Sequence, residues 1–314
     1  MKTFLLVFLV AVNLAHAESA GVPVTFRMKG GKESEMVLLG REGDRLLMHM
    51  KGAETAKTKM EISKILETRF VYPATVKQAE QAYNQNQLDK AAFLLEPTVN
   101  SWLPYLDLPA NNAVPLVMTL ADIFRHTNKV KEAQDLFSKV SKLSKSTDTV
   151  RATMWVAYCH AAQDQVEEAA KILETMEPPE RGSEQFSMAQ LIRARLQLSK
   201  KNYHAALEEI TQGIAFPRIE SDLFPECLFI SAECYAAIAA TQQTSQPSSE
   251  NTGGVQLILG STNLTQVAQN LYLEIATNFP DTPWAKKSQS KIQRSMPPVK
   301  AGGSEGAKPS SKEH

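Results

Sequence analysis

The chain has 314 residues, of which 43% are hydrophobic, and its 34 basic residues balance its 34 acidic ones. This length and composition suit about two domains with packed cores. A formal net charge of zero gives no electrostatic basis for binding nucleic acid or an anionic membrane. We therefore expect neither of those partners.

Residues 1–17 have the pattern of a secretory signal. Lys2 is their only charge, residues 4–12 form an apolar core, and residues 15–17 (Ala-His-Ala) have the small-x-small form that signal peptidase cleaves. The alternative is a membrane anchor, but the apolar run is too short to cross a hydrocarbon layer of about 30 Å. We expect an exported mature chain that begins at Glu18, has no membrane span, and is periplasmic or secreted.

Residues 18–72 are expected to form a small β-rich module. Four or five short runs with strand-like alternation lie between Val22 and Phe70, and glycine-containing turns separate them. This pattern is typical of a small barrel, which closes its own edges, and it resembles SH3-like or Sm-like barrels. Such barrels can bind peptides or RNA. Behind a secretory signal we favour a structural or docking role.

The stretch over residues 114–213 repeats one pattern three times. A short phrase ending in a small residue recurs at Ala133, Ala169 and Ala206, with spacings of 36 and 37 residues. Apolar segments of helical period flank each copy. A period in the mid-thirties, built from two amphipathic helices with alanine at their close crossing, is typical of a solenoid of helical hairpins.

These residues resemble the tetratricopeptide repeat family. In that family the first helix of a repeat carries a large apolar, a small and an aromatic residue, and the second carries alanine followed by a large apolar residue. One copy, counted as repeat two, matches fully with Leu120, Ala121, Phe124, Ala133 and Phe137. The next copy has His160 in place of the aromatic residue. The resemblance covers residues 75–295 and implies a mainly α fold, a tetratricopeptide-type α-solenoid of about five helical hairpins behind the small SH3- or Sm-like β module.

Two departures from even spacing stand out along the array. The 42 residues between Ala91 and Ala133 predict extra residues in the first repeat, near Pro104, which would end or kink a helix. After residue 240, a polar turn-forming stretch followed by the apolar run 255–259 predicts an insertion that either tucks against the array or serves as a docking strand. The expected divisions are a signal (1–17), a β-rich module (18–72), a helical repeat domain (73–296, with the insertion at 241–262) and a disordered tail (297–314).

The sequence contains no motif that predicts catalysis, a cofactor or a metal. No two histidines have the His-x-x-x-His spacing and no two cysteines the Cys-x-x-Cys spacing, so no pair presents two ligands to one metal ion. A nucleophile elbow, a phosphate-cradling loop and a dinucleotide fingerprint are also missing. Cys159, Cys227 and Cys234 are expected to be buried thiols, with one disulfide as the alternative because export permits it.

The family resemblance also implies where a partner would bind. In tetratricopeptide repeats, fixed positions of the first helices line a concave groove, and these positions carry over to one set of residues here. The candidate groove residues are Met118, Asp122, Arg125 and His126 in repeat two, Arg151, Met154 and Tyr158 in repeat three, Met188, Leu191 and Arg195 in repeat four, and Phe229 and Glu233 in repeat five.

Three functions are therefore open. The first is a non-enzymatic scaffold that captures a protein or peptide partner in this groove. The second is a structural subunit of a cell-envelope assembly or secretion complex, which would pack through its β module, insertion or end cap. An exported enzyme is the third and is disfavoured. The segment 272–285 is similar to repeats of bacterial periplasmic scaffolds, which favours a bacterial envelope.

Overall fold

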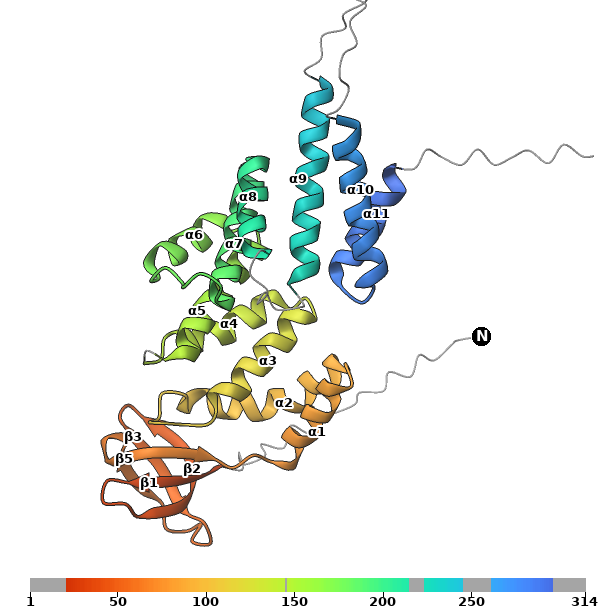
Figure 1. Ribbon diagram of the computed structural model, residues 1–314. Helices are drawn as coiled ribbons and strands as arrows, with labels where there is room; N and C mark the ends of the chain where they lie inside the picture. The colour runs from red at the N-terminus through yellow and green to blue at the C-terminus, as the bar shows by residue number, and fades with distance from the viewer. Residues whose placement is uncertain (1–20, 145, 215–222, 245–260, 296–314) are drawn as a thin grey trace, which may run out of the picture. The chain divides into compact units, whose positions relative to one another are not determined.

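The structure is a computed structural model that describes residues 21–144, 146–214, 223–244 and 261–295 (Figure 1). The described part is mainly helical, with a small antiparallel sheet at its N-terminal end, as the sequence predicts. The chain divides into two compact units, Met1–Cys159 and His160–His314. The expected signal, the tail and most of the expected insertion lie outside the described residues.

The sheet has five strands in the order β4-β3-β2-β1-β5, and every neighbouring pair is antiparallel. The strands are β1 (Val22–Met28), β2 (Glu33–Glu42), β3 (Arg45–Met50), β4 (Thr58–Glu61) and β5 (Ile65–Phe70). Alternate side chains of β1, β2 and β3 form the core of the sheet, because successive residues of a strand point to opposite faces. Phe26, Leu38, Leu46 and Met48 are each buried to 1% exposure or less.

The helices follow in pairs. The first unit contains α1 (Ala74–Asn84), α2 (Leu88–Trp102), α3 (Val114–His126), α4 (Val130–Ser141) and most of α5 (Thr147–Ala162). The second contains α6 (Val166–Thr175), α7 (Glu184–Ser199), α8 (Tyr203–Ile214), α9 (Phe224–Thr244), α10 (Ser261–Asn278) and α11 (Pro283–Ser295). Helices α1 and α2, α3 and α4, α7 and α8, and α9 and α10 pack on each other.

One turn recurs four times between consecutive helices. Its central residue has a left-handed backbone, at Asn86 (φ 57°), Asn128 (φ 62°), Asp164 (φ 59°) and Lys201 (φ 60°). In each copy the next residue donates its N–H to a carbonyl five positions earlier, which is the bond that closes a Schellman cap. These bonds are Gln87 to Ala82 (2.8 Å), Lys129 to Phe124 (2.8 Å), Gln165 to His160 (2.9 Å) and Asn202 to Gln197 (2.9 Å).

Each turn is followed, five residues after its left-handed position, by a buried alanine. These alanines are Ala91, Ala133, Ala169 and Ala206, and none is more than 1% exposed. They lie in the first turn of the second helix, where a larger side chain would push the paired helices apart. The turns therefore recur with the same spacings of 42, 36 and 37 residues as the alanines.

The extra residues of the first repeat connect the sheet to the helices. Helix α2 ends at Trp102, and the 3₁₀ turn Leu103–Tyr105, which contains the expected helix-ending Pro104, begins a connector that runs over residues 103–113 to α3. At the outer edge of β5, the Thr68 N–H donates to the Pro109 carbonyl at 3.0 Å. The Asn112 side chain accepts from the Phe70 N–H at 2.7 Å and donates to the Phe70 carbonyl at 3.1 Å. The connector thus satisfies backbone groups that an edge strand would leave exposed.

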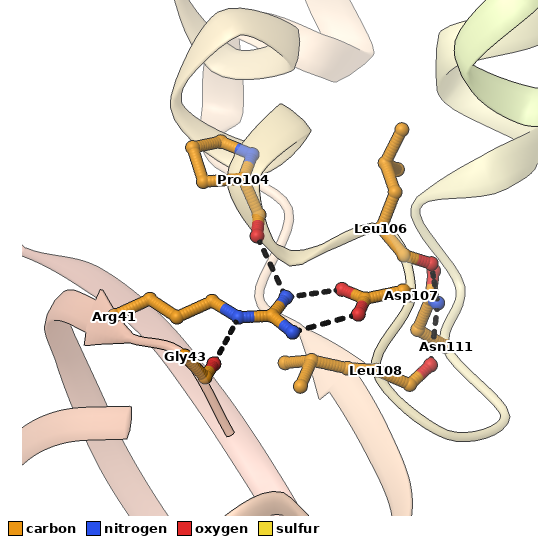
Figure 2. Close-up of polar contacts among 7 residues, drawn as sticks. All are labelled: Arg41, Gly43, Pro104, Leu106, Asp107, Leu108 and Asn111. Carbon is orange, nitrogen blue, oxygen red and sulfur yellow. Dashed lines mark hydrogen bonds and ion pairs between the residues drawn. The ribbon is translucent and has the colours of Figure 1, made fainter. Parts of the chain in front are cut away.

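An ion pair fastens the same connector to β2 (Figure 2). Arg41 donates to both carboxylate oxygens of Asp107, with Nη2 2.8 Å from Oδ2, and also to the Pro104 carbonyl at 3.2 Å. Its Nε donates to the carbonyl of Gly43 at 2.8 Å, which orients the guanidinium. Within the connector, the Asn111 side chain donates to the Leu106 and Leu108 carbonyls at 2.7 and 2.8 Å (Figure 2).

Aromatic packing completes this junction. Trp102 is 2% exposed, and its ring centroid lies 4.8 Å from that of Phe70 and 5.4 Å from that of Tyr72. The Tyr72 hydroxyl donates to the Asn112 carbonyl at 2.8 Å. The sheet and the first helices accordingly form one packed body within the first unit.

Candidate partner-binding surface

Three of the candidate groove residues form one charged cluster on α3. Arg125 Nη2 lies 2.7 Å from Asp122 Oδ1, and its Nε donates to the same oxygen at 3.0 Å. His126 Nε2 lies 3.4 Å from the other oxygen, Oδ2. The Arg125 guanidinium also lies 4.2 Å from the ring centroid of Trp155 on α5, as a cation–π contact. The side chains of Asp122 and His126 are each 28% exposed, whereas that of Arg125 is only 7% exposed.

This arrangement favours the ionised form of Asp122. Burial by itself would raise the pKa of the carboxyl group. The hydrogen bond from His126 and the positive charge of Arg125 outweigh burial and lower the pKa of Asp122 from 3.8 to about 2. The cluster therefore holds a carboxylate, partly open to solvent, in a fixed position.

A pH titration of stability tests this cluster. Because the folded pKa of Asp122 lies below its unfolded value, its contribution is complete above about pH 5 and is lost as the pH falls through 4 toward 2. The free energy of unfolding of the wild-type protein should fall by about 2 kcal/mol more over this range than that of Asp122→Asn. Denaturant unfolding at a series of pH values measures both curves, and parallel curves would show that Asp122 is not stabilised in this way.

Helices α5 and α7 place most of their candidate groove residues inside the fold. Met154 and Tyr158 on α5 are 1% and 6% exposed, and Met188 and Leu191 on α7 are 2% and 1% exposed. Met118 on α3 is half-buried, and Arg151 on α5 is exposed. Of the candidates in the first unit, Met118, Asp122, His126 and Arg151 therefore offer accessible side chains.

Arg195 contacts three other segments within the second unit. Its Nε donates to an oxygen of Glu226 on α9, a side chain with no exposed surface. Its Nη1 donates to the Ala161 carbonyl at the end of α5, at 3.3 Å. The guanidinium also lies 5.5 Å from the ring centroid of Trp284 on α11. Arg195 therefore compensates a buried charge, and its own side chain is only 15% exposed.

The two candidates on α9, Phe229 and Glu233, contact the last two helices. The Phe229 ring centroid lies 5.8 Å from that of Tyr272 on α10 and 5.2 Å from that of Trp284 on α11. Glu233 accepts a hydrogen bond from the Tyr272 hydroxyl and pairs with Lys291 at 2.6 Å. Burial and the Glu233 carboxylate raise the pKa of Tyr272, so the phenol remains a proton donor.

Sequence reasoning did not single out the aromatic residues that organise these clusters. Trp155 lies under Arg125, and Trp284 lies between Phe229 and Arg195. Each occupies an interior-facing position of its helix, where an indole in an amphipathic pattern indicates only core. No local sequence motif distinguishes a tryptophan that packs on a cation from one that packs only in the core.

The three cysteine thiols of the described residues are buried. Cys159, Cys227 and Cys234 are buried thiols, and burial raises the pKa of Cys227 and raises that of Cys234 to about 12. Across the described ranges, no three His, Cys, Asp or Glu side chains gather where they could hold a metal ion. None of the helices in those ranges has the length and apolar character needed to cross a membrane.

No protein-family model matches this chain, and no curated protein matches its sequence. The tetratricopeptide resemblance therefore stays a prediction from the residue pattern.

Proposed function

We propose that this protein is a non-enzymatic, exported scaffold of the tetratricopeptide repeat type that binds a protein or peptide partner. Binding would use the exposed candidate positions on the first helices of the hairpins, such as those of α3 and α5 in the first unit. The protein would act in the periplasm or outside the cell, in a bacterial envelope. The observation that carries this proposal is the turn repeated at Asn86, Asn128, Asp164 and Lys201, each followed by a buried alanine. Repeated hairpins that stack on their neighbours typically create an extended binding surface.

The accessible candidates define where contact would occur in the first unit. Met118 supplies an unbranched, adaptable apolar side chain, and Arg151 supplies an exposed guanidinium that can grip a carboxylate with two hydrogen bonds. Asp122 supplies a carboxylate that the Arg125 and His126 contacts hold in place. A partner segment with both apolar and charged side chains would complement this surface.

A paired substitution tests this surface. Met118→Ala combined with Arg151→Glu should weaken partner capture by tenfold or more, on the order of the loss at an interface hot spot. Partners captured from the native envelope by the wild-type protein would be quantified by mass spectrometry, with circular dichroism to verify folding. The control, Gln134→Ala combined with Lys139→Glu, makes the same kinds of change on α4, a second helix. Equal capture by both variants would reject the first-helix face as the binding surface.

The alternative, a structural subunit of an envelope assembly, is favoured by one observation. The connector fixes the sheet to the first helices, so the sheet can present a rigid surface to a neighbouring protein. Deleting the sheet would be a poor test, because it would expose Trp102. Reversing the charges of Lys51 and Lys59, which are 69% and 51% exposed, leaves the core intact. Loss of assembly in this variant, with partner capture by Arg151→Glu unchanged, would favour the structural role.

A further inference from the structure

Helix α11 differs in charge from every other α-helix in the described ranges. Its sequence carries Lys286, Lys287, Lys291 and Arg294 and no acidic residue, whereas each of the other ten contains at least one Asp or Glu. An end cap of a repeat array needs a polar outer face, but that need does not explain a single sign of charge. Its composition gives α11 a net positive charge.

Three of these cations lie on one side of the helix. Lys287, Lys291 and Arg294 are spaced i, i+4 and i+7, which places them in one row along the helix axis. The opposite side is packed into the fold: Ala285 is fully buried, and Ile292 packs against a cluster that contains Tyr272. We call Lys287, Lys291 and Arg294 the α11 basic row.

One member of this row, Lys291, is paired with a nearby carboxylate. Glu226 is engaged by Arg195, and Glu233 is engaged by Tyr272 and by Lys291, the one member of the row that it compensates. Lys287 instead lies 4.1 Å above the centroid of the Trp284 ring. Within the described part of the chain, no carboxylate lies at ion-pair distance from Lys287. Burial and the charge of Arg195 lower the pKa of Lys287, whereas more distant carboxylates, including Glu226, Asp164 and Glu233, act in the opposite direction.

We propose that the α11 basic row is a docking surface for an acidic segment of a protein partner. The inference rests on the proposed function, because it names the chemistry of one partner of that scaffold. The row extends about 10 Å along the helix, which matches a few residues of an extended peptide. Carboxylates of that peptide would neutralise Lys287 and Arg294, and the Trp284 indole offers an apolar contact beside them. Anionic membranes and nucleic acids are instead recognised by larger basic clusters.

The test measures direct binding of the full mature chain to a short poly-glutamate peptide. The variant reverses Lys286, Lys287 and Arg294 to Glu and leaves Lys291 in its pair with Glu233. Its matched control reverses Lys131, Lys139 and Lys142, three exposed lysines in and just after α4, and so makes the same change in net charge. We expect the α11 variant to bind poly-glutamate about tenfold more weakly than the wild type. The control should bind with near wild-type affinity. Wild-type binding should weaken as the salt concentration increases.

Three results would overturn this inference. They are equal loss in the α11 and control variants, no wild-type binding to poly-glutamate at low salt, and equally tight wild-type binding to phosphatidylglycerol vesicles or to duplex DNA through the same residues. If the triple variant melts at a lower temperature than the wild type, poly-glutamate binding is measured instead for the single variants Lys287→Gln and Arg294→Gln. Each is compared with Lys139→Gln. If the wild-type protein captures envelope partners through α3 and α5 but does not bind poly-glutamate, this inference alone is refuted. Absence of any envelope partner would refute the proposed function.

Discussion

Replacing Arg195 by alanine should lower the free energy of unfolding of the second unit by about 3–5 kcal/mol. The reason is that Glu226 has no exposed surface and accepts a hydrogen bond from Arg195. Removing the guanidinium deprives this buried carboxylate of the hydrogen bond and the positive charge of Arg195. The Ala161 carbonyl and the Trp284 ring lose contacts in the same substitution.

Denaturant unfolding of Arg195→Ala, Glu226→Gln and the double variant measures this effect. The double variant should be more stable than Arg195→Ala alone, because glutamine removes the buried negative charge that Arg195 contacts in the wild type. If Arg195→Ala unfolds within about 0.5 kcal/mol of the wild type, as an ordinary surface substitution does, Arg195 is a surface residue and remains available to a partner. The predicted result means that charge reversal at Arg195 would report on stability and not on partner binding.

Replacing Trp102 by alanine should cost about 3–5 kcal/mol and loosen the sheet from the helices. Trp102 is 2% exposed and packs on Phe70 and Tyr72, so truncation opens a cavity at the point where the connector meets β5. The Asn112 bonds to the backbone of Phe70 should weaken with it, because their geometry depends on that packing.

Hydrogen exchange read by mass spectrometry shows both consequences. Amides of β5 and of the connector should exchange faster in Trp102→Ala, while those of α7 and α8 stay at wild-type rates. The control is Phe93→Ala on the same helix α2, because Phe93 is 76% exposed and its truncation should cost less than about 0.5 kcal/mol. Unchanged exchange in β5 would mean that the sheet is held by other contacts.

The helical hairpins and the sheet could be predicted because their signals are local. Ala133, Ala169 and Ala206 mark the first turn of a second helix in each copy, and each is buried as the spacing predicts. The five strands follow from alternation and from glycine at the turns. These features depend on neighbours within a few residues, which a sequence pattern records directly.

The junction between the sheet and the helices could not be predicted because its contacts are long-range. Arg41 and Asp107 are 66 residues apart, and Phe70 and Asn112 are 42 apart. The unequal repeat spacing predicted extra residues there, but it did not predict that they would contact β2 and β5. An asparagine side chain that pairs with a strand edge has no periodic signature.

The candidate groove could be predicted only as a helix face. Positions carried over from the resembled family predict which side of a first helix would line a groove, but they do not say how deeply neighbouring helices cover that side. Met154 and Leu191 are buried, whereas Arg151 is exposed, although all three come from the same rule. Burial depends on the side chains of adjacent helices, whose positions the repeat pattern does not encode.

Site-specific photocrosslinking in the native cell envelope tests the central claim, that a partner binds the first-helix face. A photoreactive residue at position 118 or 151 should give a defined adduct with another protein, whereas one at position 139 on α4 should give none. Adducts from position 139 but from neither first-helix position, or turnover of a small substrate by the purified chain, would contradict the scaffold account.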